Sequence, residues 1–162
     1  SHLEGVVREA AEKFVESRIR EGENLKNDLL AKLDGMSELV AYIEEKSPQI
    51  IEDYKARLIE KVDELAINTQ IDDQRIAAEV TMYADKVCVD EEVVRLRSHI
   101  DSTRKILTEG GAVGRKLDFI VQEMNREANT ILSKANSLII ADKGIDLKTE
   151  IEKVREQIQN IE

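Results

Sequence analysis

The sequence predicts an all-α protein, and both its composition and its residue spacing support that fold class. Apolar residues make up 41% of the 162 residues and charged residues 36%, with one proline and no tryptophan. Chains poor in aromatic and turn residues are typically helical. Apolar residues also recur three and four positions apart, as on one buried helix face. We therefore expect an elongated helical bundle, in which a long antiparallel helical hairpin arm precedes a compact set of four helices.

Residues 1–70 are expected to form the hairpin arm. From Val6 to Lys46 the apolar side chains keep a helical spacing, which predicts one long helix. Ser47 and Pro48 then resemble a helix start, with an N-cap followed by proline at the first helical position. A second helix is expected to run to about Ala66. Two long helices joined by so short a break should fold back on each other.

Residues 71–162 are expected to form the bundle that carries the candidate site. Acidic residues and glycines divide this half of the chain into helices, because aspartate favours helix starts and glycine favours helix ends. The expected boundaries are a connector at Asn68–Gln70, N-caps at Asp72 or Asp73 and at Asp90, a helix end at Gly110–Gly111, a central helix from about Val113 to Ile140, and a break at Lys143–Gly144 before a last helix.

The central helix has an unusual polar face. A helix face that only contacts solvent is usually rich in lysine and glutamate, whereas this one also contains asparagine, glutamine and arginine. Asparagine has a poorer helix propensity than alanine, lysine or glutamate, so solubility alone does not require it. We therefore interpret this face as functional. Its members are Arg115, Lys116, Asp118, Gln122, Glu123, Asn125, Arg126, Glu127, Asn129 and Lys134.

Three segments resemble the C-terminal half of the YicC/YloC family of bacterial proteins. They are GGAVGRKLDFIVQEMNREANTILSKAN, RIAAEVTMYADKVCVDEEVVRLRSHI before it, and EIEKVREQIQNIE at the end of the chain. The resemblance covers Arg75 to Glu162 strongly and the earlier helices more loosely. It implies a stress-associated endoribonuclease that assembles as a ring-like homo-oligomer, with a hexamer as the family expectation. It also implies an N-terminal domain that precedes this region.

Four side chains are candidates for metal or acid–base chemistry. Glu123 and Glu127 are four residues apart, so their carboxylates lie one turn apart on one helix face. Glu79 and His99 lie on the polar sides of the two preceding helices. Together the four can ligate Mg²⁺ or Mn²⁺ in a bundle, and such a metal can activate water or neutralise a phosphodiester transition state. The alternative is that both glutamates form ordinary surface ion pairs.

His99 is the most selective of these candidates, because the chain has only two histidines. An imidazole can ligate a metal, or can move a proton to or from a ribose 2′-hydroxyl or a leaving oxygen. The predicted catalytic residues are therefore His99, Glu123 and Glu127. The alternative is a helix histidine that is hydrogen-bonded to a neighbouring carboxylate.

Basic and amide side chains are the candidates for holding RNA. The planar arginine fork suits phosphate, and asparagine can bond a base edge or a phosphate. Arg115 and Lys116 are favoured because they begin a helix just after glycines, where free amides attract an anion. The alternative is that such residues pair with nearby acids or hold a partner helix. The full predicted set is Arg95, Arg115, Lys116, Asn125, Arg126, Asn129 and Lys134.

Charge and composition limit the other functional classes. The net charge of −10 argues against a protein whose whole surface binds nucleic acid. The segment from Glu79 to Lys134 is nearly neutral, however, with nine basic and ten acidic residues. No apolar run reaches the roughly 18 residues of a membrane span, no signal peptide is found, and the lone Cys88 fits a reducing compartment. We expect a cytoplasmic protein with no membrane partner.

Two functions remain open. The first, which the resemblance favours, is the C-terminal portion of a metal-assisted endoribonuclease that binds RNA and cleaves its phosphodiester bonds within a homo-oligomeric ring. The second is a non-catalytic helical scaffold for oligomerisation or partner binding. The low aromatic content supports the second, because proteins that bind single strands commonly use aromatic platforms.

Overall fold

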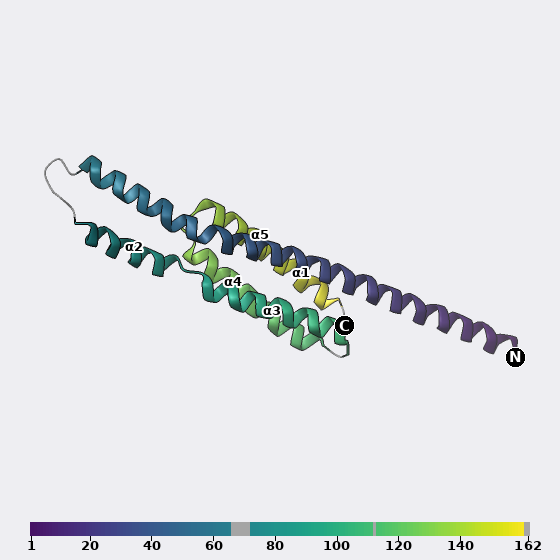
Figure 1. Cartoon of the computed structure of the whole chain (residues 1–162). Helices are drawn as coiled ribbons and strands as arrows, with labels where there is room; N and C mark the ends of the chain where they lie inside the picture. The colour runs from purple at the N-terminus through teal and green to yellow at the C-terminus, as the bar shows by residue number, and fades with distance from the viewer. Residues whose placement is uncertain (66–71, 112, 161–162) are drawn as a thin grey trace.

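The structure is a computed structural model that describes residues 1–65, 72–111 and 113–160, and within these ranges it contains helices and no strand. The predicted all-α fold class is confirmed. Figure 1 shows an elongated molecule in which one long helix runs past a bundle of shorter ones. The helices are α1 (His2–Leu65), α2 (Asp73–Val87), α3 (Asp90–Glu109), α4 (Gly114–Lys134) and α5 (Leu138–Gln159).

The middle of α1 forms a four-helix bundle with α3, α4 and α5. Helix α1 packs on α3 and α5, and α4 packs on the same two helices from the other side. Neighbours around this ring run in opposite directions (Figure 1). The core between them is apolar, and burying each large side chain there contributes about 1.5–3 kcal/mol. Its fully buried members include Leu29, Leu33, Met36, Ile43, Leu96, Ile100, Leu117, Met124, Ile131, Leu147 and Ile151.

Helix α1 is continuous through Pro48, so the predicted break at Ser47–Pro48 and the hairpin within residues 1–70 are wrong. Proline lacks an N–H and removes one helical hydrogen bond. The Ser47 hydroxyl donates to the Ile43 carbonyl at 2.7 Å one turn earlier. Packing holds both sides of the proline, since Ile43 lies in the bundle core and Tyr54 stacks on Tyr83 of α2 with centroids 3.7 Å apart. Tertiary contacts therefore outweigh the local breaking signal.

Replacing Pro48 by alanine should raise the free energy of unfolding by about 1–3 kcal/mol. Pro48 is exposed, and alanine restores the missing N–H and removes the ring's clash with the preceding turn. The midpoint and slope of urea denaturation measure the change. As a control, Ser47→Ala should lower stability, because it removes a hydrogen bond without restoring one. A loss of stability in Pro48→Ala would mean that the packing of α1 on α2 depends on the proline.

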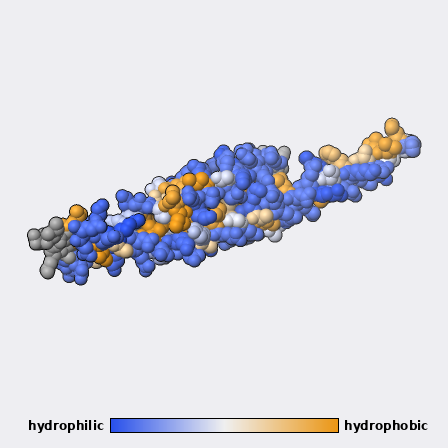
Figure 2. All heavy atoms as spheres, turned by 90° about the horizontal axis from the view of Figure 1, so that it is seen from above, coloured by the Kyte–Doolittle hydropathy of each residue, from blue (hydrophilic) through white to orange (hydrophobic). Residues whose placement is uncertain are grey.

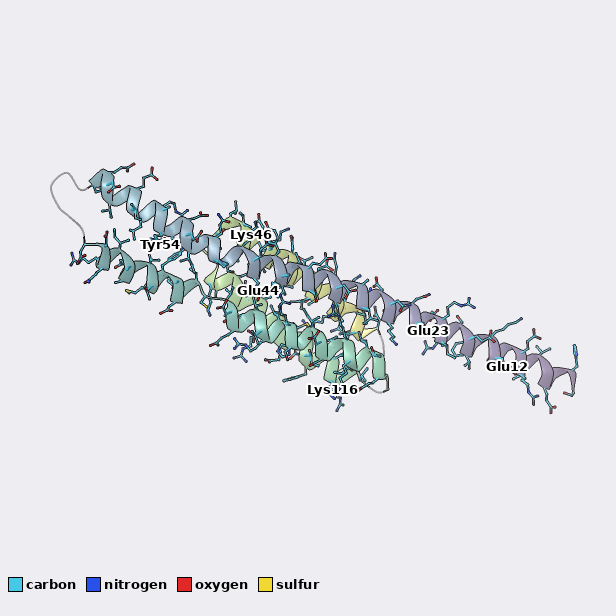
Figure 3. All side chains as sticks on the ribbon, in the orientation of Figure 1. Glu12, Glu23, Glu44, Lys46, Tyr54 and Lys116 are labelled. Carbon is cyan, nitrogen blue, oxygen red and sulfur yellow. The ribbon has the colours of Figure 1, made fainter. Side chains whose placement is uncertain are left out.

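Helix α2 folds back along the end of α1, so an antiparallel pair does form, but with a different second helix. Tyr54 lies between the two helices (Figure 3). Asp72 is the N-cap of α2, as predicted, and its carboxylate accepts a hydrogen bond from the Gln74 amide at 3.2 Å. The predicted connector at Asn68–Gln70 lies outside the described residues. The separation of residues 1–70 from residues 71–162 as folding units stays a prediction.

The boundaries of the other helices differ from the predictions in three places. Glycines 110 and 111, with φ of 74° and 96°, end α3 as expected. Asp90, however, is the first residue of α3 rather than its cap, and α4 ends at Lys134 rather than near Ile140. Gly144 does not break the chain, because it lies buried within α5. A Cβ there would come within 2.8 Å of Leu132 Cδ2, so this glycine allows α5 to pass close to α4.

The first part of α1 extends beyond the bundle without a partner in the described chain. Figure 2 shows apolar side chains at this thin N-terminal end. Leu3 is 74% exposed and Phe14 is 64% exposed, so the apolar spacing of the sequence continues further than the buried core. Among the described helices, none combines the length and the apolar character that crossing a membrane requires.

Candidate functional site

Helices α3 and α4 bring several predicted site residues together across one antiparallel seam. Arg95 Nε donates to Glu127 Oε1 at 2.8 Å, and Lys134 Nζ donates to Glu92 Oε1 at 2.8 Å. These two bonds fix the register of the pair. One turn further along α3 and one turn back along α4, the same register places His99 at the level of Glu123.

The seam contains two buried carboxylates. Glu92 is 3% exposed and Glu127 is 6% exposed. A buried charge is stable only when it is paired, and here Arg95 and Lys134 supply the positive charges. Arg95 also lies 3.2 Å from Glu91 and 3.5 Å from Glu92. Both cations are therefore engaged by carboxylates, which is the alternative that the sequence had left open for them.

Lys134 connects three helices through this network. Besides its bond to Glu92, its ammonium donates to the carbonyl of Cys88 at 3.0 Å. Cys88 follows the last residue of α2, so the C-terminal end of α4 is joined to the α2–α3 junction. The second oxygen of Glu92, Oε2, is buried without a hydrogen-bond partner in the described protein.

The protonation of the network follows from its geometry. Burial raises the pKa of Glu92, but the hydrogen bond from Lys134, a backbone hydrogen bond and the charges of Lys134 and Arg95 together hold that pKa below its ordinary value. The hydrogen bonds to Glu127 and Glu91 raise the pKa of Arg95. Glu92 is therefore ionised at neutral pH, and the network is held together as charged pairs.

The predicted four-residue metal cluster is not formed within one chain. Glu79 is exposed on α2, beside Arg75 and near Leu58 and Val62 of α1, and α2 packs mainly on α1 rather than on α4. In residues 1–65, 72–111 and 113–160 no three histidine, cysteine, aspartate or glutamate side chains converge as metal ligands. The donor set therefore does not fit a single-chain metal centre, and the need for Mg²⁺ or Mn²⁺ stays untested.

His99 and Glu123 are each half-buried on the α3–α4 seam. Neither side chain forms an ion pair with a described residue, in contrast to Arg95, Glu127 and Lys134 beside them. The seam therefore has one end closed by buried ion pairs and another end where an imidazole and a carboxylate remain available at a partly open surface.

The exposed face of α4 carries the remaining candidates. On this face, exposed side chains follow one another at alternating intervals of four and three residues. This spacing keeps them on one side of the helix, so they form one continuous row. We call this row the α4 outer stripe. Asn125 lies half-buried beside it, and Lys116 lies at its end, on the outer edge of the bundle (Figure 3). The stripe consists of Arg115, Phe119, Gln122, Arg126, Asn129 and Ser133.

Helix α4 differs from α3 in how its cations are used. All four basic residues of α3 lie in ion pairs, including Arg97 with Glu44 and Arg104 with Asp34 of α1. On α4 only Lys134 does so with a described residue. Arg115, Lys116 and Arg126 have no such carboxylate partner among the residues that the structure describes, so their charge is available to an anion.

Sequence reasoning missed two residues of this region. Glu92 is an acid in the first turn of a helix, a common position for glutamate, and the packing of α3 on α4 buries it. Phe119 was overlooked among the apolar residues of α4. It falls between the buried Leu117 and Ile120, on the polar side of the helix, and plotting the residues around the helix axis reveals this.

Comparison with known proteins identifies the family. Residues 43–162 match the family described as "Endoribonuclease YicC-like, C-terminal". The chain belongs to the YicC-like endoribonuclease family. The family match begins at Ile43, in the core of the bundle, and includes the whole of the α3–α4 seam and the α4 outer stripe. The resemblance stated from the sequence is thereby confirmed.

Two YicC-like relatives show how much of a longer protein this chain represents. It is 41% identical to "Probable endoribonuclease YicC" of Clostridioides difficile (strain 630), over all of this chain and 56% of the relative. It is 39% identical to the protein of the same name from Haemophilus influenzae, over 92% of this chain and 51% of the relative. The chain thus spans about half the length of these curated relatives.

Proposed function

We propose that this chain is the part of a YicC-like endoribonuclease that holds RNA along α4 and supplies acid–base residues for cleaving it. The observation that carries the proposal is the contrast between α3 and α4. In a chain of net charge −10, α4 keeps Arg115, Lys116 and Arg126 free of carboxylate partners in the described chain. The same helix carries the half-buried Glu123, at the level of His99 on α3. Family membership and the names of both relatives support RNA as the anion.

The proposed chemistry is transfer of the phosphoryl group within the RNA backbone. The ribose 2′ oxygen attacks the adjacent phosphorus, the bond from phosphorus to the 5′ oxygen breaks, and one proton passes from the 2′ oxygen to the 5′ oxygen. His99 is the proposed carrier of that proton, and Glu123 at the same level orients the imidazole. Arg115 and Lys116 hold the phosphates that flank the cleaved bond.

Within this proposal the buried ion pairs have a positioning role. Arg95 with Glu127 and Lys134 with Glu92 fix the register of the seam, and that register sets His99 opposite Glu123. No step is assigned to a metal, because no three potential ligands converge among the residues that the structure describes. Assays with Mg²⁺, Mn²⁺ and a chelator test whether a metal takes part.

A homo-oligomeric ring is a further part of the proposal. The projecting part of α1 leaves Leu3, Val6, Val7 and Phe14 exposed, and contiguous apolar surface of this kind commonly marks a protein contact. This surface also supports the scaffold alternative, in which the chain assembles subunits and another part of the protein cleaves RNA. Native mass spectrometry measures the assembly, and the cleavage assays separate the two functions.

The double variant Arg115→Gln, Arg126→Gln should weaken binding of a fluorescein-labelled single-stranded RNA. Each lost phosphate contact should also reduce the slope of log K against log salt by about 0.7. Fluorescence anisotropy at several salt concentrations measures both effects. The matched control is Arg8→Gln, Arg57→Gln, which removes the same charge from exposed positions on α1. Equal effects of the two double variants would contradict a binding face on α4.

A further inference from the structure

Phe119 is an exposed aromatic ring in a protein with few aromatic residues. The chain has two phenylalanines, three tyrosines and no tryptophan, and Phe119 is 63% exposed near the start of α4. No described cation lies over its ring, whereas Arg18 lies 5.8 Å from the ring centre of Phe14, the other phenylalanine. A ring so exposed offers apolar surface on which a flat partner can stack.

The neighbours of Phe119 indicate which kind of partner fits. Along the α4 outer stripe, Arg115 lies one turn before the ring and Arg126 lies two turns after it. By helix geometry the guanidinium-bearing positions are roughly 6 Å and 10 Å from Phe119 along the axis. A protein partner that covered the ring would also bury these two arginines, which have no carboxylate partner in the described chain, and burying unpaired charges is costly. A polyanion with flat apolar groups avoids that cost.

We propose that Phe119 stacks on an unpaired base of the RNA while Arg115 and Arg126 hold phosphates on either side of that nucleotide. The inference rests on the proposed function and defines its substrate as single-stranded RNA. Bases within a duplex are already stacked on each other and cannot lie flat on the ring, whereas an unpaired base can.

The first test compares Phe119→Ala with Met82→Ala in the full-length protein. Phe119 is 63% exposed and Met82, on α2, is 67% exposed, so truncation should affect stability alike. We expect Phe119→Ala to weaken binding of a labelled single-stranded RNA by about fivefold to a hundredfold. Met82→Ala should leave that affinity unchanged, and Phe119→Tyr should retain it. A duplex of the same sequence should bind both alanine variants equally.

A second readout detects the stacking itself. Because the chain contains no tryptophan, Phe119→Trp creates a single indole fluorophore at the proposed contact. Stacking of a base on the indole should quench its emission when single-stranded RNA is added, and the duplex should not. Met82→Trp is the matched control, and its emission should not change with either RNA.

The outcomes separate this inference from the function on which it rests. If the arginine double variant weakens binding but Phe119→Ala does not, the phosphate contacts stand and the stacking is overturned. If neither variant weakens binding, the proposed function fails as well. A loss of affinity that is equal for duplex and single strand also overturns the inference. So does a change in native mass in Phe119→Ala, because the ring would then contact a second copy of the chain.

Discussion

Replacing His99 by alanine should lower the rate of RNA cleavage by about 10²- to 10⁴-fold, which is the usual loss when a general acid or base is removed. RNA binding should change little, since the proposed phosphate contacts lie on α4. His99 is half-buried on the α3–α4 seam, at the level of Glu123, so removing its ring creates little empty space in the core. Glu123→Gln keeps the shape of the side chain and should also slow cleavage.

The assay follows a labelled RNA under single-turnover conditions, with Mg²⁺, with Mn²⁺ and with chelator. His2→Ala is the matched control, because His2 is the only other histidine and is exposed at the start of α1. If the full-length protein with His99→Ala cleaves RNA at an unchanged rate, the acid–base role proposed for His99 is wrong. The scaffold alternative then becomes the better account of α3 and α4.

Replacing Lys134 by methionine should lower the free energy of unfolding by about 3 kcal/mol. The substitution leaves the carboxylate of Glu92, 3% exposed, without its closest positive charge. Removing one partner of a buried ion pair typically costs 3–5 kcal/mol, and the lower value applies because Arg95 remains 3.5 Å away. Lys148→Met is the control, since Lys148 is exposed on α5 and has no ion pair with a described residue.

A second substitution and a change of pH test the cause of that loss. Adding Glu92→Gln to Lys134→Met should recover part of the stability, because no buried charge remains unpaired. Glu92 has a folded-state pKa below its unfolded value, so its ionised form stabilises the fold. That contribution is present above about pH 4.3, the ordinary pKa of glutamate, and is lost as the pH falls through the folded-state pKa. Stability of Glu92→Gln should therefore fall less steeply in acid.

The sequence predicted those features of the fold that depend on local chemistry. Asp72 caps α2 because its short carboxylate can reach a free amide, and Gly110 and Gly111 end α3 because they adopt positive φ. Pro48 and Gly144 were misjudged, since both normally interrupt helices. In this protein, packing on α2 keeps α1 helical beyond Pro48, and Gly144 is required because α5 approaches α4 closely there.

The candidate site was partly predictable for the same reason. Residue spacing shows which side of a helix a residue occupies, and it placed the exposed Arg115, Gln122, Arg126 and Asn129 together on one side of α4. It also placed Glu127 there, although the structure buries it, and it left out the exposed Phe119. It does not show which helices are neighbours. Glu79 was grouped with Glu127 on the assumption that α2 packs on α4, whereas α2 lies along α1. The role of Glu92 could be recognised only once the pairing of α3 with α4 was known, because its ion-pair partner, Lys134, comes from a different helix.

The continuity of α1 gives the molecule a mechanical property. At 64 residues the helix is a rod roughly 95 Å long, and the bundle supports it over its middle, from Leu29 to Ile43. A rod supported in this way acts as a lever. A tilt of about 10° about the centre of the support, near Met36, displaces the N-terminal tip by roughly 9 Å, and the opposite end, with α2 attached through Tyr54 and Tyr83, swings the other way. We therefore expect a displacement of one tip to move the far end of the helix as well.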